Sequence, residues 1–257
     1  MPITRKALLL SNPGEDGAEN YVEGVNVDIV KYKQLLMSNV GGAWEKDEIW
    51  ELDRPDVKNA RFYLNLLSAY DYVFILFTGH GWYSSVEQDR ILELRKGQEI
   101  RSIELSTGTK RRTVVIDSCQ KVHHEPLVES LMAKEGMFSA ANIQRTPNRE
   151  KCRKQFFDSI VAAPGPLVRL FSCRIGEVSS ASDTEGSYFV ASLVNCADAW
   201  VDGQAKRPFG TPAESYSVIA AHQCATIRTH ALSGDTQHPT AEQAKTAPYF
   251  PFAVFAD

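Results

Sequence analysis

Short apolar runs alternate with longer stretches in which apolar residues recur every three or four positions. The continuous runs are too short for helices and break at Gly, Pro, Asn or Asp, which predicts buried strands at 7–10, 72–77, 114–116 and 167–172. The helical period predicts helices at 25–37, 56–69, 149–163, 187–201 and 214–228. A short strand is expected at 48–52, a hairpin turning at Gly97, and a last edge strand within 249–255.

Strands alternating with amphipathic helices predict an α/β fold, a three-layer α/β/α sandwich with a mostly parallel central sheet. No repeat or low-complexity linker divides the sequence, so we expect residues 1–257 to form a single domain. In such a sheet, functional groups gather at the carboxyl ends of the strands. His80, Cys119 and the pair Ser172-Cys173 all lie at such ends.

Composition and charge narrow the function classes. The 257 residues are 43% hydrophobic and 23% charged, with a net charge of −4, as in ordinary globular proteins. The basic residues are dispersed, which argues against a nucleic-acid partner, and the basic groups at 95–96 and 110–112 are interpreted as solvated turns. We expect neither a membrane partner nor a targeting segment, because no apolar stretch approaches the roughly 18 residues of a membrane span. The five cysteines, at 119, 152, 173, 196 and 224, are interpreted as reduced thiols of a cytoplasmic protein.

The sharpest chemical feature is a histidine and a cysteine, each directly after a predicted strand. His80 lies in T-G-H-G and Cys119 in D-S-C-Q. An imidazole beside a thiol can accept its proton or stabilise the thiolate, which produces a strong nucleophile. The backbone N–H groups of Gly81 and Cys119 are candidates to bind the oxyanion of an acyl-transfer intermediate. Taken singly, either residue is more often structural than catalytic, and a cysteine after a strand is usually a small core residue.

At these residues the sequence resembles the caspase and metacaspase superfamily of cysteine peptidases, including its bacterial members. T-G-H-G is similar to the S/T-G-H-G histidine motif, and D-S-C-Q to the metacaspase D-x-C motif. Further similar segments lie at 24–28 (G-V-N-V-D), 171–180 and 186–193, so the resemblance covers roughly residues 7–201. It implies the caspase–haemoglobinase type of sandwich, with peptide-bond hydrolysis through a thioester on Cys119 and proton transfer by His80.

The resemblance also implies a specificity. Metacaspases cut after Arg or Lys because acidic residues line the pocket for that side chain, and the matching positions here are Asp28, Thr78 and Asp117. A carboxylate in a partly dry pocket favours a cation, because another side chain would leave it unpaired. Two plainer interpretations remain: Asp117 as a hydrogen-bonding residue that shapes the cysteine loop, and Asp28 as a solvated helix position.

Calcium, which many metacaspases need, is not supported here. Between His80 and Cys119 the only aspartates are Asp89 and Asp117, and the next lies at Asp158. We therefore expect that no metal or other cofactor is required. Residues 120–155 are long and basic, which fits an activation linker cut by the enzyme itself or an ordered surface excursion.

The leading hypothesis is thus a cysteine endopeptidase that cleaves a protein or peptide after Arg or Lys, in bacterial regulated death or antiphage defence, with a regulatory partner as a further expectation. One alternative is a catalytically silent, caspase-like binding or scaffold module. Others are a peptidase with a different preference and a thiol hydrolase acting on a non-peptide substrate.

Overall fold

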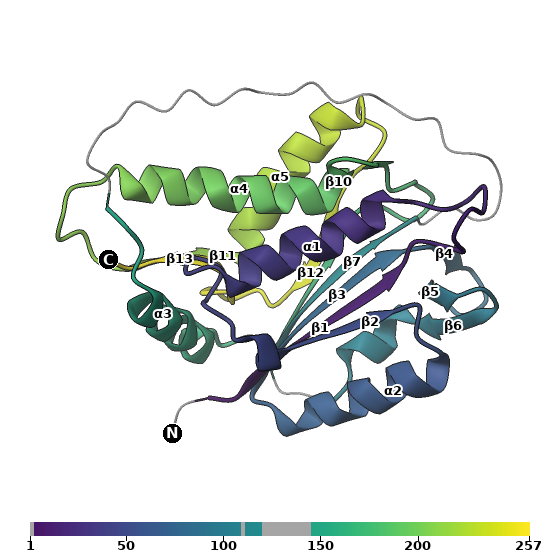
Figure 1. The fold of residues 1–257 in the computed structure, drawn as a ribbon, viewed down its shortest axis with the longest axis horizontal. Coiled ribbons are helices and arrows are strands. Elements are labelled where there is room, and N and C mark those ends of the chain that lie inside the picture. Colours follow the sequence, from purple (N-terminus) through teal and green to yellow (C-terminus); the bar gives the residue numbers. More distant parts are fainter. Residues whose placement is uncertain (1–2, 109–110, 120–144) are drawn as a thin grey trace.

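A six-stranded, mostly parallel sheet forms the centre of the molecule (Figure 1). The computed structural model describes residues 3–108, 111–119 and 145–257. The strand order is β12-β8-β7-β3-β1-β2, and only β12 runs antiparallel to its neighbour. The strands are β1 (Arg5–Asn12), β2 (Ile49–Asp53), β3 (Tyr72–Gly79), β7 (Arg111–Ser118), β8 (Leu167–Phe171) and β12 (Thr240–Gln243). The predicted α/β class and mostly parallel sheet are confirmed.

Helices and a small sheet cover the two faces, as three layers require (Figure 1). One face packs against α1 (Gly24–Met37), α3 (Arg149–Ala162), α4 (Tyr188–Ala205) and α5 (Val218–Leu232). The other packs against α2 (Val57–Leu66) and a three-stranded antiparallel sheet of β4 (Gly81–Ser84), β5 (Asp89–Arg95) and β6 (Gln98–Arg101). Because side chains alternate along a strand, β3 supplies Phe74 and Leu76 to the first core and Ile75 and Phe77 to the second.

Short elements complete the fold. Single-turn 3₁₀ helices lie at η1 (Lys46–Glu48) and η2 (Leu67–Ala69), and a longer one at η3 (Ser102–Ser106). Two small antiparallel pairs join β9 (Ala181–Ser182) to β10 (Gly186–Ser187) and β11 (Glu214–Ser217) to β13 (Pro251–Phe255).

The helix starts follow from local capping. The side chain of Asp56 accepts a hydrogen bond from the backbone N–H of Asn59 at 2.7 Å and so caps α2. Ser187 caps α4 in the same way, by accepting from the N–H of Val190 at 3.3 Å. This cap sets the position of Ser187 beside the candidate site described below.

Two expectations about elements were wrong. The helix predicted at 214–228 begins only at Val218, because residues 214–217 pair as β11 with β13 and Ser217 caps the helix. The predicted last strand is not at an edge of the central sheet: β13 is buried throughout and pairs with β11. The edge position is taken by the polar strand β12.

Two expectations about individual side chains also need correction. Arg112 is not in a solvated turn but lies within β7, 2% exposed, where its guanidinium donates to the carbonyl oxygens of Leu105 and Thr107. Cys196 and Cys224 form a disulfide between α4 and α5, so these two are not free thiols; Cys119, Cys152 and Cys173 are. Neighbouring helices place the two sulfurs together, although 28 residues separate them in the chain.

No helix within the described parts of the chain is long and apolar enough to cross a membrane.

Candidate active site

His80 and Cys119 follow two neighbouring strands at the same level of the sheet. Strands β3 and β7 pair in parallel with Thr78 opposite Asp117 and Gly79 opposite Ser118. His80 and Cys119 are the next residues of the two chains, and both are half-buried. The in-register pairing therefore delivers an imidazole and a thiol to one end of the sheet.

The backbone around His80 is shaped by a close approach of β1. Gly79 has φ of +146°, and a Cβ there would lie 2.4 Å from the carbonyl oxygen of Asn12, so only glycine fits. The ring itself lies against Gly14, whose added Cβ would be 3.2 Å from Nε2 of His80. This Nε2 is buried and has no hydrogen-bond partner among the described residues.

Cys119 is held by the loop after β8. Its Sγ lies 3.6 Å from the carbonyl oxygen of Ser179, which accepts the thiol hydrogen. Gly81 lies close to the same strand end, since a Cβ on it would be 3.0 Å from the Ser118 side chain. The two residues considered for oxyanion binding, Gly81 and Cys119, are therefore both next to Ser118.

Asp28, Thr78 and Asp117, predicted as one pocket, come together below this strand end. The Oγ1 of Thr78 donates to Oδ2 of Asp28 at 2.7 Å, and the N–H of Ser187 donates to Oδ1 at 2.9 Å. Asp117 accepts hydrogen bonds from the hydroxyls of Ser179 and Ser187. Asp28 is 0% exposed and Asp117 3%, so the interpretation of Asp28 as a solvated helix position was wrong.

Burial raises the pKa of both carboxyl groups. Burial, and secondly the charge of Asp117, raise the pKa of Asp28 to about 8. Burial likewise raises the pKa of Asp117, against the opposing effect of its hydroxyl donors. Neither acid forms an ion pair with a Lys or Arg of the described residues; the donors around them are hydroxyls and backbone N–H groups. The pair is thus a buried acidic site without a described counter-ion.

Sequence reasoning missed the residues that hold these acids. Ser179 and Ser187 lie in segments whose family resemblance was noted, but no role was predicted for them. Gly186 was missed too: its φ is +82°, and an added Cβ would lie 2.3 Å from Oδ1 of Asp28. The sequence signal that could have identified Ser187 is its place as a capping serine before a predicted helix, preceded by Gly186.

The fold and the pair of strand ends define a class: an α/β protein that presents an imidazole and a thiol together, the arrangement on which thiol hydrolases depend. Comparison with known proteins identifies the family within this class. The caspase domain model matches residues 4–246. The crystal structure of caspase-1 from Spodoptera frugiperda is similar with a TM-score of 0.56 and 12% identity, covering 94% of this chain and 86% of that one. At this identity the similarity shows the fold alone.

No curated protein matches the chain in sequence. The family match nevertheless spans nearly all of it. The chain belongs to the caspase family and is a cysteine-type endopeptidase.

Proposed function

We propose that His80 and Cys119 are the catalytic dyad of this endopeptidase. His80 accepts the thiol proton of Cys119, the sulfur attacks the scissile carbonyl carbon and forms an S–C bond, and the N–H groups of Gly81 and Cys119 bind the oxyanion. His80 donates a proton to the leaving amine as the C–N bond breaks, and water then hydrolyses the thioester. The observation that carries this proposal is the register of β3 and β7, which ends both strands one residue before these side chains.

The proposed cleavage is after Arg or Lys. The supporting observation is the pair of buried carboxyl groups, Asp28 and Asp117, to which described residues bring only hydroxyl and N–H donors. A guanidinium or ammonium group entering this site would supply the missing positive charge, whereas an acidic or apolar side chain would leave the acids unpaired.

A competing role for Asp117 is structural. Its bonds to Ser179 and Ser187 link β7 to the loop after β8 and to the start of α4. A variant that keeps the shape and removes the charge separates the two roles, since asparagine can still accept one of these hydrogen bonds.

The test uses fluorogenic peptides that differ only in the residue before the scissile bond: Arg, Lys, Asp or Leu. We expect turnover of the Arg and Lys peptides, none with Cys119→Ala, and at least a tenfold fall in kcat/KM for Asp117→Asn. Asp202→Asn, an exposed acid on α4, is the matched control and should leave kcat/KM unchanged.

Other outcomes are equally informative. Cleavage after Asp or Leu would contradict the assignment of the Asp28–Asp117 pocket to a basic side chain. It would not contradict the catalytic role of His80 and Cys119. Activity that survives Cys119→Ala would contradict the dyad. A lack of turnover for every peptide would favour the scaffold alternative.

We propose further that turnover needs no metal. Of the two aspartates between His80 and Cys119, Asp89 already accepts bonds from the Ser102 hydroxyl at 2.6 Å and the Ile103 N–H at 3.1 Å, and Asp117 is buried. Equal rates with calcium and with a chelator are expected; a requirement for calcium would overturn this part.

Self-cleavage in the predicted linker at 120–155 is also proposed, and we place it before residue 145. Residues 120–144 lie outside the described residues. From Arg145 onward the basic side chains are engaged: Arg145 pairs with Asp257, and Arg153 with Glu48. A basic preference therefore leaves Lys121 and Lys134 as the cleavage points, and mass spectrometry of the incubated protein would identify them.

The physiological substrate is proposed to be a protein partner in bacterial regulated death or antiphage defence. This rests on the family resemblance. Expression in bacteria beside Cys119→Ala, with scoring of growth and phage resistance, tests it; no difference between the two would contradict it.

A further inference from the structure

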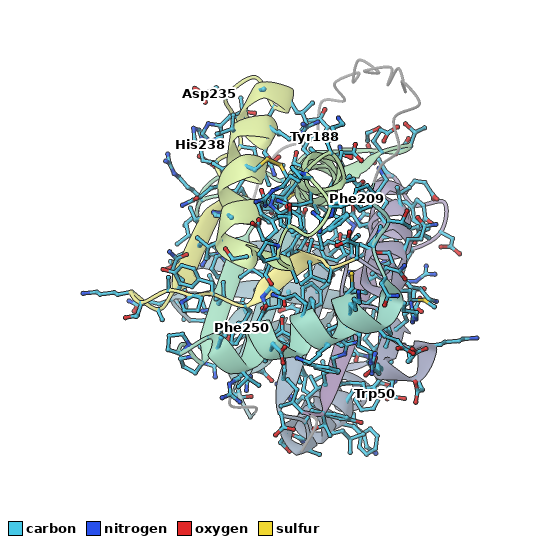
Figure 2. All side chains as sticks on the ribbon, turned by 90° about the vertical axis from the view of Figure 1, so that its left-hand side faces the viewer. Trp50, Tyr188, Phe209, Asp235, His238 and Phe250 are labelled. Atoms are coloured by element: carbon cyan, nitrogen blue, oxygen red, sulfur yellow. A yellow bond between two sulfur atoms is a disulfide. The ribbon has the colours of Figure 1, made fainter. Side chains whose placement is uncertain are left out.

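Three potential metal ligands converge where α5 ends. His230 lies in the last turn of α5, and Asp235 and His238 lie in the loop that follows. One ligand atom from each lies within 4.8 Å of the other two. Figure 2 shows Asp235 and His238 beside this end of the helix. No part of the proposed peptidase chemistry uses these side chains.

The spacing of these atoms matches a tetrahedral metal. Oδ1 of Asp235 lies 3.6 Å from Nδ1 of His230 and 3.5 Å from Nε2 of His238. Zinc bonds to nitrogen and oxygen of about 2.0–2.1 Å place neighbouring ligand atoms roughly 3.4 Å apart in a tetrahedron. Two of the three separations between ligand atoms are thus close to the tetrahedral value, and the third is no longer than 4.8 Å.

The carboxylate of Glu177 already orients one ligand, His238. Nδ1 of His238 lies 2.7 Å from Oε1 of Glu177, and the backbone N–H of His238 donates to Oε2 at 2.8 Å. A carboxylate at Nδ1 favours the tautomer that carries its hydrogen there, so the lone pair of Nε2 faces Asp235. A carboxylate–histidine pair directed at two further ligands is the usual support of a bound zinc ion.

Ion pairing alone explains the cluster less well. Asp235 is 78% exposed at its side chain, where an ion pair with histidine contributes little. The rings of His230 and His238 have centroids 4.5 Å apart, so both rings lie close enough to contribute to one ion.

We propose that His230, Asp235 and His238 bind a zinc-type divalent cation, with Glu177 as the residue that positions His238. Three protein ligands leave a fourth position for water or an outside ligand. Softer borderline metals are favoured over calcium or magnesium, because two of the three ligands are imidazoles.

The site is connected to the loop that contacts the candidate nucleophile. Gln237, between two of the ligands, is 0% exposed and donates to the carbonyl oxygen of Ser172 at 2.9 Å and to Oγ of Ser179 at 3.2 Å. It also accepts from the N–H of Ser180 at 3.0 Å. The carbonyl of Ser179 in turn accepts from Cys119. A bound cation would therefore stabilise the loop that holds the thiol.

The test measures zinc binding by titration calorimetry and visible absorbance of the cobalt-substituted protein. All proteins carry Cys119→Ala, so that the thiol cannot bind the ion and the result is independent of peptidase activity. We expect one ion per chain, a rise in Tm with zinc, and at least a tenfold loss of affinity for His230→Ala and for His238→Ala. Glu177→Gln should lower affinity by about ten- to a hundredfold without removing a ligand.

Two controls locate the ion. Asp183→Asn, an exposed acid on a nearby loop, should bind zinc as the parent does. The double variant His123→Ala/His124→Ala should do the same. Absence of binding at millimolar zinc would overturn the proposal, as would affinity that persists in both His230→Ala and His238→Ala or is lost only in the double variant.

Discussion

Asp28 and Asp117 are two carboxyl groups that the fold holds away from water. Burial disfavours their charged forms, which is why the pKa of each is raised. The same burial strengthens any attraction to a cation that reaches them. A group that destabilises the empty protein when ionised can thus select a basic substrate side chain.

The pH dependence of turnover should report this pair. Binding a basic side chain favours full ionisation and releases a proton, so we expect kcat/KM for an Arg peptide to rise with pH up to about 8, the raised pKa of Asp28. Asp117→Asn removes the neighbouring charge and should move this rise to lower pH. Initial rates between pH 5 and 9 measure it, and an unshifted profile would argue that Asp117 is not ionised near Asp28.

The pH dependence of stability is a second test of the direction in which the pKa of Asp28 is shifted. Because the folded pKa of Asp28 exceeds its unfolded value, the folded state binds more protons between about pH 4 and 8, and stability falls as pH rises through this range. The Asp28→Asn variant has no acid at this position, so its stability does not fall with pH in this way. Its Tm relative to the parent protein should therefore be higher at pH 8 than at pH 5.

At the scale of elements, one carboxylate joins three of them. Glu48 of η1 accepts hydrogen bonds from Arg5 of β1 at 3.1 Å and from Arg153 of α3 at 2.7 Å. The side chain of Arg5 is 0% exposed and stacks over Trp44 at 4.1 Å, and burial lowers its pKa to about 10. Burial alone would raise the pKa of Glu48, but the two guanidinium groups outweigh it and lower the pKa to about 2.

Replacing this carboxylate should weaken the fold. We expect Glu48→Gln to reduce the free energy of unfolding by about 3 kcal/mol, because it leaves the buried Arg5 charge uncompensated. Urea denaturation measures it. Glu51→Gln, in a half-exposed pair with Lys33, is the control and should cost less than about 1 kcal/mol. Equal effects in the two variants would contradict a special role for Glu48.

The pH dependence of this contribution has the opposite sign to that of Asp28. The stabilisation by Glu48 is present above about pH 4.5 and is lost as pH falls toward 2. The difference in stability between the parent and Glu48→Gln should shrink over that range.

At the scale of the whole molecule, a covalent link joins two helices of the same layer. The Cys196–Cys224 disulfide closes a loop across 28 residues between α4 and α5, on the side of the sheet that carries the larger core. A reducing cytoplasm would keep these two thiols reduced. The disulfide therefore argues against the cytoplasmic location expected from the sequence.

Thiol counting tests this link. Protein purified without reductant and unfolded in guanidinium should expose three reactive thiols, and five after reduction. The loop length predicts a loss of about 3–4 kcal/mol of stability on reduction. The double variant Cys196→Ser/Cys224→Ser should be insensitive to reductant. Five reactive thiols before reduction would show that the link does not form.

The sequence by itself determined the parallel strands of the central sheet and most of the helices, because their hydrophobic patterns are local properties of the chain. It also predicted that His80 and Cys119 would meet, since the carboxyl ends of parallel strands lie at one end of the sheet. The positions of Asp28, Thr78 and Asp117 followed from the family resemblance in the same way.

Only the tertiary structure decided the rest, because it depends on contacts between distant segments. The strands β11 and β12 have four mostly polar residues each, too few for a local pattern to reveal their pairing. Asp28 lies on a helix of mixed polarity and is buried only because Thr78 and Ser187 pack against it. The disulfide, the hydroxyl donors of Asp117 and the cluster of His230, Asp235 and His238 likewise arise where α4, α5 and the loops beside them fold onto the central sheet.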